Sequence, residues 1–163
     1  MITTNKFIDE LNKNDLKFFS GVPDSVLKEF CFSVDKKIGS KHYVAANEGS
    51  AIGIGIGYHL KTKKIPVIYM QNSGLGNAIN PLISLADAKV YNIPLFLIIG
   101  WRGEPNKDFL DEPQHITQGK ETINFLKRLG IKYKIINSKS NFRKMIKNLK
   151  DYSNKKKTPV CIL

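Results

Sequence analysis

Residues 47–57 read Asn47-Glu48-Gly49-Ser50-Ala51-Ile52-Gly53-Ile54-Gly55-Ile56-Gly57 and directly follow the apolar run 43–46. The apolar run predicts a buried strand, and the polar residues after it predict a sharp turn into a helix. Gly49, Gly53 and Gly57 recur every four residues, so they share one helix face. Because glycine inside a helix costs about 1 kcal/mol relative to alanine, this spacing indicates that another helix or a flat ligand approaches that face closely.

Glu48 allows two interpretations at this position. An acidic residue in the first turn of a helix gains roughly 0.3–1 kcal/mol from the helix dipole. Alternatively, its carboxylate is presented at the C-terminal edge of a sheet, where open α/β folds bind their ligands. The local pattern alone leaves both interpretations open.

Length and composition are those of one globular domain. The chain has 163 residues, of which 42% are hydrophobic, and this length supports a core of its own. Neither a membrane-spanning run nor a signal peptide is visible, which predicts a cytoplasmic protein without a membrane partner. Cys31 and Cys161 each lie in an apolar run, which favours free thiols in a reducing cytoplasm, with a lone disulfide as the alternative.

The net charge of +12 is concentrated in one part of the chain. Residues 127–157 hold twelve lysines and arginines but a single acid, Asp151, and therefore carry +11. Such a stretch is typical either of a nucleic-acid surface or of a solvated, lysine-coated helix face. It contains no nucleic-acid motif and no interleaved exposed aromatics, so we expect the solvated face and no nucleic-acid partner.

Helical and strand patterns alternate along the whole chain, without an internal repeat. Helices are expected at 4–13, from Val26 to Val34, after residue 48, and at 78–85, 122–129 and 141–152. Strands are expected at 16–20, 41–46, 65–70, 94–99, 133–136 and 158–163. The runs 65–70 and 94–99 are apolar on both faces, as central parallel strands are. We predict an α/β fold, a parallel β-sheet of about six strands with helices on both faces.

Polar turns follow three of the expected strands, at 47–49, 71–77 and 100–104. The ends of parallel strands share one edge of a sheet, so these turns should converge. Gly74-Leu75-Gly76 lacks the third glycine of a dinucleotide fingerprint because position 79 is Ile79. No phosphate-binding loop, zinc ligand set or nucleophile elbow is present, and we assign no metal ligand.

Three further residues have both a chemical and a structural interpretation. Arg102 could clamp an anion with two hydrogen bonds, or it could form a surface ion pair with Glu104 or Asp111. His115 lies in a polar loop, where a lone histidine is usually structural. Asp24 follows a turn and has the common role of a helix cap as its alternative. These residues alone indicate an α/β ligand-binding domain with an acid at a strand end.

Five blocks of sequence closely resemble phosphonopyruvate decarboxylases, which are thiamine-diphosphate enzymes. The blocks are 21–25, 45–49, 69–81, 100–105 and 111–115, and the resemblance extends over about residues 16–163. The matching part is the N-terminal, pyrimidine-binding domain, so residues 1–163 are expected to form this single domain. The alpha subunit of sulfopyruvate decarboxylase is similar and about as short.

The resemblance implies a role for Glu48 and for the turn at 72–76. Glu48 resembles the glutamate that hydrogen-bonds N1′ of the aminopyrimidine and favours the tautomer whose 4′-nitrogen removes the C2 proton of the thiazolium. The protein controls the tautomer, and the cofactor serves as the electron sink. Four residues are expected to surround the pyrimidine, namely Asn72, Ser73, Gly74 and Gly76.

The same resemblance implies roles for residues around the substrate. His115 and Gln114 match a loop that reaches the reacting carbon, and Arg102 is expected to hold the phosphonate. Asp24 is expected to transfer a proton after CO2 has left, and Ser25 beside it to contact the substrate.

The domain that binds Mg2+ and the diphosphate is not recognisable in this sequence. The resemblance therefore implies a half-site, inactive without a diphosphate-binding domain or beta subunit, within a homo-oligomer. The leading hypothesis is decarboxylation of 3-phosphonopyruvate, a small anionic 2-oxo acid, to phosphonoacetaldehyde and CO2. The alternatives are the alpha subunit of sulfopyruvate decarboxylase and a non-catalytic interaction module with the same fold.

Overall fold

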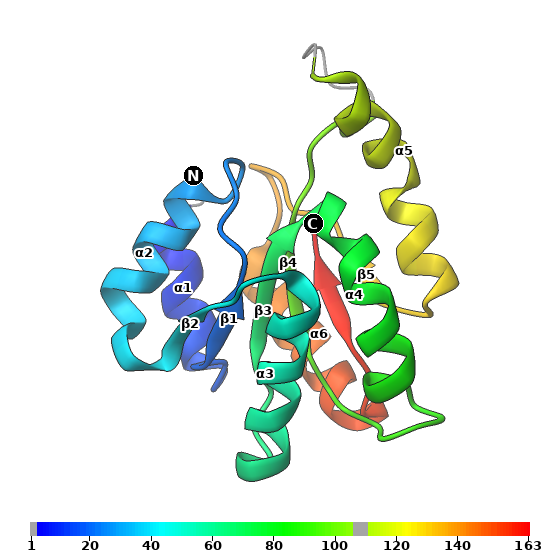
Figure 1. The fold of residues 1–163 in the computed structure, drawn as a ribbon. Coiled ribbons are helices and arrows are strands. Elements are labelled where there is room, and N and C mark those ends of the chain that lie inside the picture. Colours follow the sequence, from blue (N-terminus) through cyan, green and yellow to red (C-terminus); the bar gives the residue numbers. More distant parts are fainter. Residues whose placement is uncertain (1–2, 106–110) are drawn as a thin grey trace.

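The computed structural model describes residues 3–105 and 111–163 and is built around one parallel sheet (Figure 1). Within these residues the sheet has six strands in the order β2-β1-β3-β4-β6-β5. The strands are β1 (Phe19–Gly21), β2 (His42–Val44), β3 (Val67–Gln71), β4 (Phe96–Gly100), β5 (Lys132–Lys134) and β6 (Val160–Ile162). All five neighbouring pairs are parallel, which confirms the predicted fold class.

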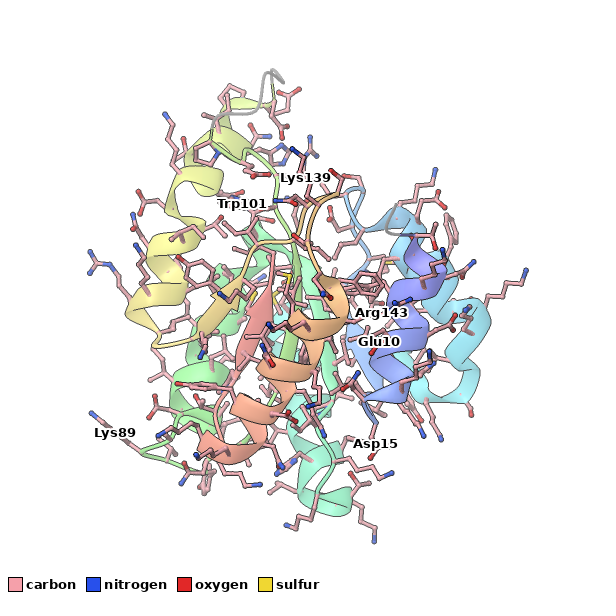
Figure 2. All side chains as sticks on the ribbon, turned by 180° about the vertical axis from the view of Figure 1, so that it is seen from behind. Glu10, Asp15, Lys89, Trp101, Lys139 and Arg143 are labelled. Carbon is pink, nitrogen blue, oxygen red and sulfur yellow. The ribbon has the colours of Figure 1, made fainter. Side chains whose placement is uncertain are left out.

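Helices cover both faces of this sheet. They are α1 (Thr4–Lys13), α2 (Lys28–Ile38), α3 (Glu48–Thr62), α4 (Leu75–Pro81), α5 (Pro113–Arg128) and α6 (Phe142–Lys156). Three short helical turns complete the set, η1 (Gly39–Lys41), η2 (Asn72–Gly74) and η3 (Leu82–Ala86). One layer contains α1, α2 and α6, and the other contains α3, α4 and α5 (Figures 1 and 2).

The two central strands explain why their sequences are apolar without alternation. In β3, Val67 and Tyr69 pack toward α1 and α2, whereas Ile68 and Met70 pack toward α3 and α4. Each strand therefore contributes to two hydrophobic clusters, one in each layer. A strand buried on both faces gains from apolar residues at every position.

The strand predicted at 43–46 is not buried, because β2 lies at the edge of the sheet. Tyr43 is 49% exposed and Val44 is 60% exposed, and only Ala45 joins the core. Val26 is also exposed, since α2 begins two residues later at Lys28. The helical pattern predicts Val26, Leu27, Phe30 and Val34 on the inward side; this is wrong for Val26, whereas Phe30 and Val34 are buried as predicted.

One helix cap and one helix start differ from the sequence prediction. The first helix begins at Thr4 as expected, but the cap that its sequence pattern predicts at Thr4 is formed by Thr3, whose side chain accepts a hydrogen bond from Lys6 N at 3.4 Å. The helix expected at 122–129 is the second half of α5, which begins at Pro113. Proline fits the first turn of a helix because its missing N–H is not needed there. His115 therefore lies in a helix and not in a polar loop.

The glycines of α3 differ in their surroundings. Among the described residues, a Cβ at Gly53 or Gly57 would meet no atom within 4 Å. A Cβ at Gly55, on the opposite side of the helix, would lie 2.6 Å from Ile68 Cδ1. The close approach predicted for the glycine face is thus found at Gly49, where a Cβ would lie 3.0 Å from Asn77 O, but not at Gly53 or Gly57.

The two cysteines are free, and the sheet separates them. Cys31 packs in the layer of α1 and α2, whereas Cys161 belongs to the cluster on the other side. Burial raises the pKa of the Cys161 thiol. In residues 3–105 and 111–163, no helix combines the length and the apolar character needed to cross a bilayer.

Alanine substitutions in α3 should separate these two glycine environments. Gly53→Ala should raise the free energy of unfolding of the dilute chain by about 0.5–1 kcal/mol, because alanine lowers the entropy cost of helix formation and finds open space. Gly55→Ala is the matched control and should lower the free energy of unfolding, because the buried Ile68 has no room to move. Urea denaturation measures both, and a destabilised Gly53→Ala chain would contradict the open glycine face.

Candidate active site

The turns after β2, β3 and β4 converge at the carboxyl edge of the sheet, as predicted. Contacts between side chains connect Glu48 to residues 74–77, and further hydrogen bonds connect Asn72 to Arg102. Open α/β sheets bind ligands at this edge. The candidate site is therefore built from these turns.

Glu48 is the first residue of α3, directly behind the helix cap. The Asn47 side chain accepts a hydrogen bond from Ser50 N at 2.9 Å, which fixes the start of the helix. Glu48 Oε2 accepts a hydrogen bond from Asn77 Nδ2 at 2.8 Å. A Cβ at Gly74 would lie 2.5 Å from Glu48 Oε1, so only glycine leaves space for the carboxylate at this point.

Asn72 ties the ends of β3 and β4 together. Its Oδ1 accepts from Arg102 N at 3.0 Å, and its Nδ2 donates to Arg102 O at 3.0 Å and to Thr122 Oγ1 at 2.9 Å. The residue is buried, and these bonds occupy its side-chain amide. Asn72 was predicted to contact the cofactor, but the structure gives its side chain a bridging position.

Asp111 holds together the residues of the loop after β4. Its carboxylate accepts from Arg102 Nη2 at 2.6 Å, from Arg102 Nε at 3.3 Å and from Gly103 N at 3.2 Å. His115 Nδ1 lies 2.9 Å from Asp111 Oδ1. The hydrogen bonds from Arg102 hold the pKa of Asp111 well below its ordinary value, and His115 and the Glu112 N–H act in the same direction.

The same loop packs directly on the backbone of α5. Gly103 has a φ of +63°, and a Cβ there would collide with His115 O. A Cβ at Gly119 would in turn collide with Gly103 O, so both positions require glycine. Trp101 Nε1 donates to Gly119 O at 2.9 Å. Arg102 and His115 are therefore held on rigidly packed elements.

Asp24 reaches from the turn after β1 to the end of β4. A Cβ at Gly100 would lie 2.6 Å from Asp24 Oδ2. This oxygen accepts from Leu27 N at 3.3 Å within the turn before α2, whose N-cap is Leu27 without a side-chain cap, so the capping role given above as the alternative is not found. Ser25 Oγ donates to Asp24 Oδ1 at 3.4 Å. Asp24 thus places its carboxylate beside Gly100, two residues before Arg102 in the chain.

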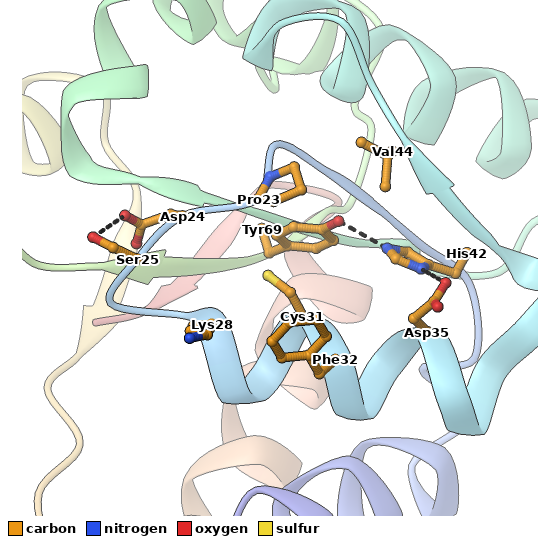
Figure 3. Close-up of a pocket in the computed structure, with 10 residues that line it drawn as sticks. All are labelled: Pro23, Asp24, Ser25, Lys28, Cys31, Phe32, Asp35, His42, Val44 and Tyr69. Atoms are coloured by element: carbon orange, nitrogen blue, oxygen red, sulfur yellow. Dashed lines mark hydrogen bonds and ion pairs between the residues drawn. The ribbon is translucent and has the colours of Figure 1, made fainter.

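A pocket of about 450 Å³ lies between this turn and α2 (Figure 3). Tyr69 forms part of its wall, and its hydroxyl lies 2.8 Å from His42 Nε2. His42 Nδ1 lies 3.3 Å from Asp35 Oδ1, so a chain of hydrogen bonds connects β3, β2 and α2. Burial raises the pKa of Tyr69 and that of Cys31, which also lines the pocket. Both groups stay protonated at neutral pH.

Most of the predicted site residues fall into three groups. The first contains Glu48 and Gly74, the second Arg102 and His115, and the third Asp24 and Ser25. Ser73 accepts from Gln71 Nε2 at 3.0 Å beside the first group. Gly76 is open on its outer side, and Gln114 is exposed in the first turn of α5. Residues 106–110, between the blocks at 100–105 and 111–115, lie outside the described residues.

Sequence reasoning gave no site role to Asn77, Asp111 or Thr122. Asn77 was visible as a polar residue in the turn after β3, one helical turn beyond Gly74. Asp111 entered only as a surface partner of Arg102, whereas it also holds His115 and Gly103. In the part of the chain that the structure describes, no three His, Cys, Asp or Glu residues are grouped so as to hold a metal ion.

The contacts of Asp111 predict a pH-dependent contribution to stability. A carboxyl group whose pKa is lower in the folded state stabilises the fold above its ordinary pKa, and this contribution is lost as the pH falls through the folded-state pKa. Asp111→Asn should therefore lower the urea midpoint most above about pH 5 and progressively less below about pH 4.

The exposed pair of Asp9 and Lys37 provides the control. Asp9→Asn should change the midpoint little, as isolated surface ion pairs contribute little. A midpoint difference for Asp111→Asn that stays constant down to pH 3 would contradict the role of the ionised carboxylate.

Residues 1–122 match the family model described as "Thiamine pyrophosphate enzyme, N-terminal TPP binding domain". The chain is 32% identical over 146 residues to the sulfopyruvate decarboxylase alpha subunit of Methanococcus maripaludis, covering 90% of this chain and 84% of that protein. It is 31% identical over 153 residues to the Methanocaldococcus jannaschii subunit, covering 94% and 87%.

A second kind of relative is longer than this chain. The phosphonopyruvate decarboxylase of Streptomyces viridochromogenes is 33% identical over 117 residues, which are 72% of this chain but 28% of that enzyme. The fold also resembles benzoylformate decarboxylase from Polynucleobacter necessarius, with a TM-score of 0.69, 20% identity, and coverage of 99% of this chain and 29% of that one. The chain belongs to the family of N-terminal thiamine-pyrophosphate-binding domains of thiamine-pyrophosphate enzymes.

Proposed function

We propose that this chain is the pyrimidine-binding half of a thiamine-diphosphate-dependent 2-oxo acid decarboxylase that acts on 3-phosphonopyruvate. The observation that carries the proposal is the Glu48 carboxylate, which Asn77 holds against the Cα of Gly74. The products would be phosphonoacetaldehyde and CO2.

The surroundings of Glu48 fit an aminopyrimidine ring. Glu48 Oε1 has no hydrogen-bond partner among residues 3–105 and 111–163, so it can accept a hydrogen bond from a protonated ring nitrogen of the pyrimidine. Gly74 has no side chain to block a flat ring there. Thiamine diphosphate, when bound, would supply the electron sink, which takes up the electrons of the carbon–carbon bond that breaks when CO2 leaves. In this proposal Glu48 controls the protonation state of the pyrimidine.

The second and third groups of residues are placed to handle the substrate. Arg102 is paired with Asp111, but its side chain is still 29% exposed, so an anionic substrate group can reach it. Asp111 orients His115, and Gln114 lies beside it in the same helical turn. In this proposal Asp24 returns a proton to the product carbon.

A partner must supply the diphosphate site, with its Mg2+, in this proposal. Support comes from the open side of α3, where a Cβ at Gly53 or Gly57 would meet no atom of the described residues within 4 Å and Ile54 is 38% exposed. A diphosphate-binding domain or subunit would cover this side in a homo-oligomer of the working enzyme. The free thiols are compatible with a cytoplasmic location.

Sulfopyruvate is the second candidate substrate. The observation that favours it is coverage, because the alignments include 84–87% of the sulfopyruvate decarboxylase alpha subunits. Both substrates combine a 2-oxo acid with a tetrahedral anionic group. The chain, with the matching diphosphate-binding partner, Mg2+ and thiamine diphosphate, should release CO2 from one of them. If it releases CO2 from neither, the non-catalytic interaction module becomes the better interpretation.

Glu48→Gln should lower decarboxylation by orders of magnitude and leave the fold intact. The neutral amide cannot stabilise a protonated pyrimidine nitrogen as a carboxylate does. Glu29→Gln is the matched control, because Glu29 occupies the first turn of α2 and stands in the same relation to a helix dipole. Turnover and circular dichroism of the complete enzyme measure both effects. Near-normal turnover of Glu48→Gln would reduce Glu48 to a helix-dipole residue.

Arg102→Ala should weaken substrate binding more than cofactor binding. Loss of a charge-assisted hydrogen bond to the tetrahedral anion should cost roughly 1.5–3 kcal/mol in kcat/KM. The affinity for thiamine diphosphate should hardly change. Arg128→Ala, in the last turn of α5, controls for the loss of a positive charge. A fall in cofactor affinity with an unchanged KM would place Arg102 at the cofactor instead.

A further inference from the structure

A groove of about 510 Å³ lies between β5 and α6. Lys132, Lys134 and Lys144 line its walls together with Asn141 and Asn148. Met145 and the buried Leu149 supply an apolar surface. α6 lies across the back of the molecule (Figure 2), in the layer opposite α3 and Glu48. The groove is therefore separate from the candidate active site.

Within the part of the chain that the structure describes, no carboxylate neutralises the positive charge in this groove. No acidic residue is among those that line it, and neither Lys134 nor Lys144 has an acidic partner within the described ranges. Lys132 Nζ lies 4.0 Å from the centre of the Tyr152 ring. Because the ring is uncharged, this contact does not neutralise the lysine.

Three basic residues of α6 outside the groove have acidic neighbours. Lys147 and Lys150 lie 3.8 and 3.9 Å from Asp151, and Arg143 lies 3.7 Å from Glu10, labelled in Figure 2. The exposed lysines of the last turn, Lys155 and Lys156, lie outside the groove, so what distinguishes the groove is that its lysines surround a hollow.

This arrangement weakens the fold in the absence of a ligand. Three ammonium groups share one groove and repel each other. Lys144 also lies in the first turn of α6, which contains no acid, and a cation is unfavourable at that end of a helix. A bound anion would remove both costs.

We propose that the groove binds a small phosphorylated molecule with at least two negative charges. Lysine ammonium groups bind phosphate as point charges, and Asn148, whose side chain has no hydrogen-bond partner among the described residues, can complete the polar contacts. No exposed aromatic ring lines the groove for base stacking, which disfavours single-stranded nucleic acid. The proposal does not depend on the decarboxylase function.

The test is calorimetric titration of the chain with inorganic pyrophosphate and with ADP at about 150 mM salt. The wild type should bind one equivalent of pyrophosphate. The double variant Lys134→Glu/Lys144→Glu should lose about tenfold or more in affinity, and Lys134→Gln/Lys144→Gln serves if the first does not fold. Tighter binding of ADP than of pyrophosphate would assign the ligand to nucleotides rather than to free phosphates, both within the proposed class.

Lys155→Glu/Lys156→Glu is the matched control, because it makes the same charge change in the last turn of α6, outside the groove. It should reduce the affinity by less than about twofold, since charges far from the ligand are screened. Equal losses in the two double variants, or no saturable binding at this salt, would overturn the proposal. Displacement of pyrophosphate by a tighter-binding single-stranded RNA would also overturn it. Glu48→Gln should leave pyrophosphate binding unchanged, which separates this site from the cofactor site.

Discussion

The hydrogen bonds between the Asn72 side chain and the backbone of Arg102 hold the candidate site together. The backbone pairing of β3 with β4 ends at Gln71 and Gly100. Directly beyond it, the Asn72 side-chain amide forms hydrogen bonds with the N–H and C=O of Arg102 and so continues to connect the two chain segments. Its third bond, to Thr122, adds α5. Since buried amides are costly to leave unpaired, this bridge fixes the spacing between the Glu48 group and the Arg102–His115 group. Residues proposed to serve the cofactor and the substrate are therefore positioned by one side chain.

Glycines at or just beyond the strand ends leave space for side chains that reach over from neighbouring turns. Gly74 leaves space for the Glu48 carboxylate, and Gly100 leaves space for that of Asp24. Two carboxylates thus stand at the same edge of the sheet, on either side of β3. Asp111 adds a third, which is neutralised by Arg102 and stays ionised to low pH. The edge combines carboxylates with a fixed guanidinium, which suits the proposed reaction of an anionic substrate that exchanges protons.

The two faces of the sheet carry different chemistry. The face with α3, α4 and α5 positions the candidate active site, and within the described residues it leaves α3 uncovered at Gly53 and Gly57. The face with α6 carries the basic groove. The stretch 127–157 was predicted to be a solvated, lysine-coated face, and for the last turns of α6 the exposed lysines agree with that. Lys132, Lys134 and Lys144, in β5 and in the first turn of α6, instead line the basic groove.

The sequence by itself determined the alternation of strands and helices and the two-sided burial of β3 and β4, because apolar periodicity is a local property. It also placed Glu48 in the first turn of a helix, and its resemblance to a known family supplied the cofactor. Tertiary structure alone decided that β2 is an edge strand, that His115 lies in the first turn of a helix, and that Asp111 joins Arg102 to His115. Strand order and contacts between residues distant in the chain depend on how the layers pack, and no local pattern encodes them.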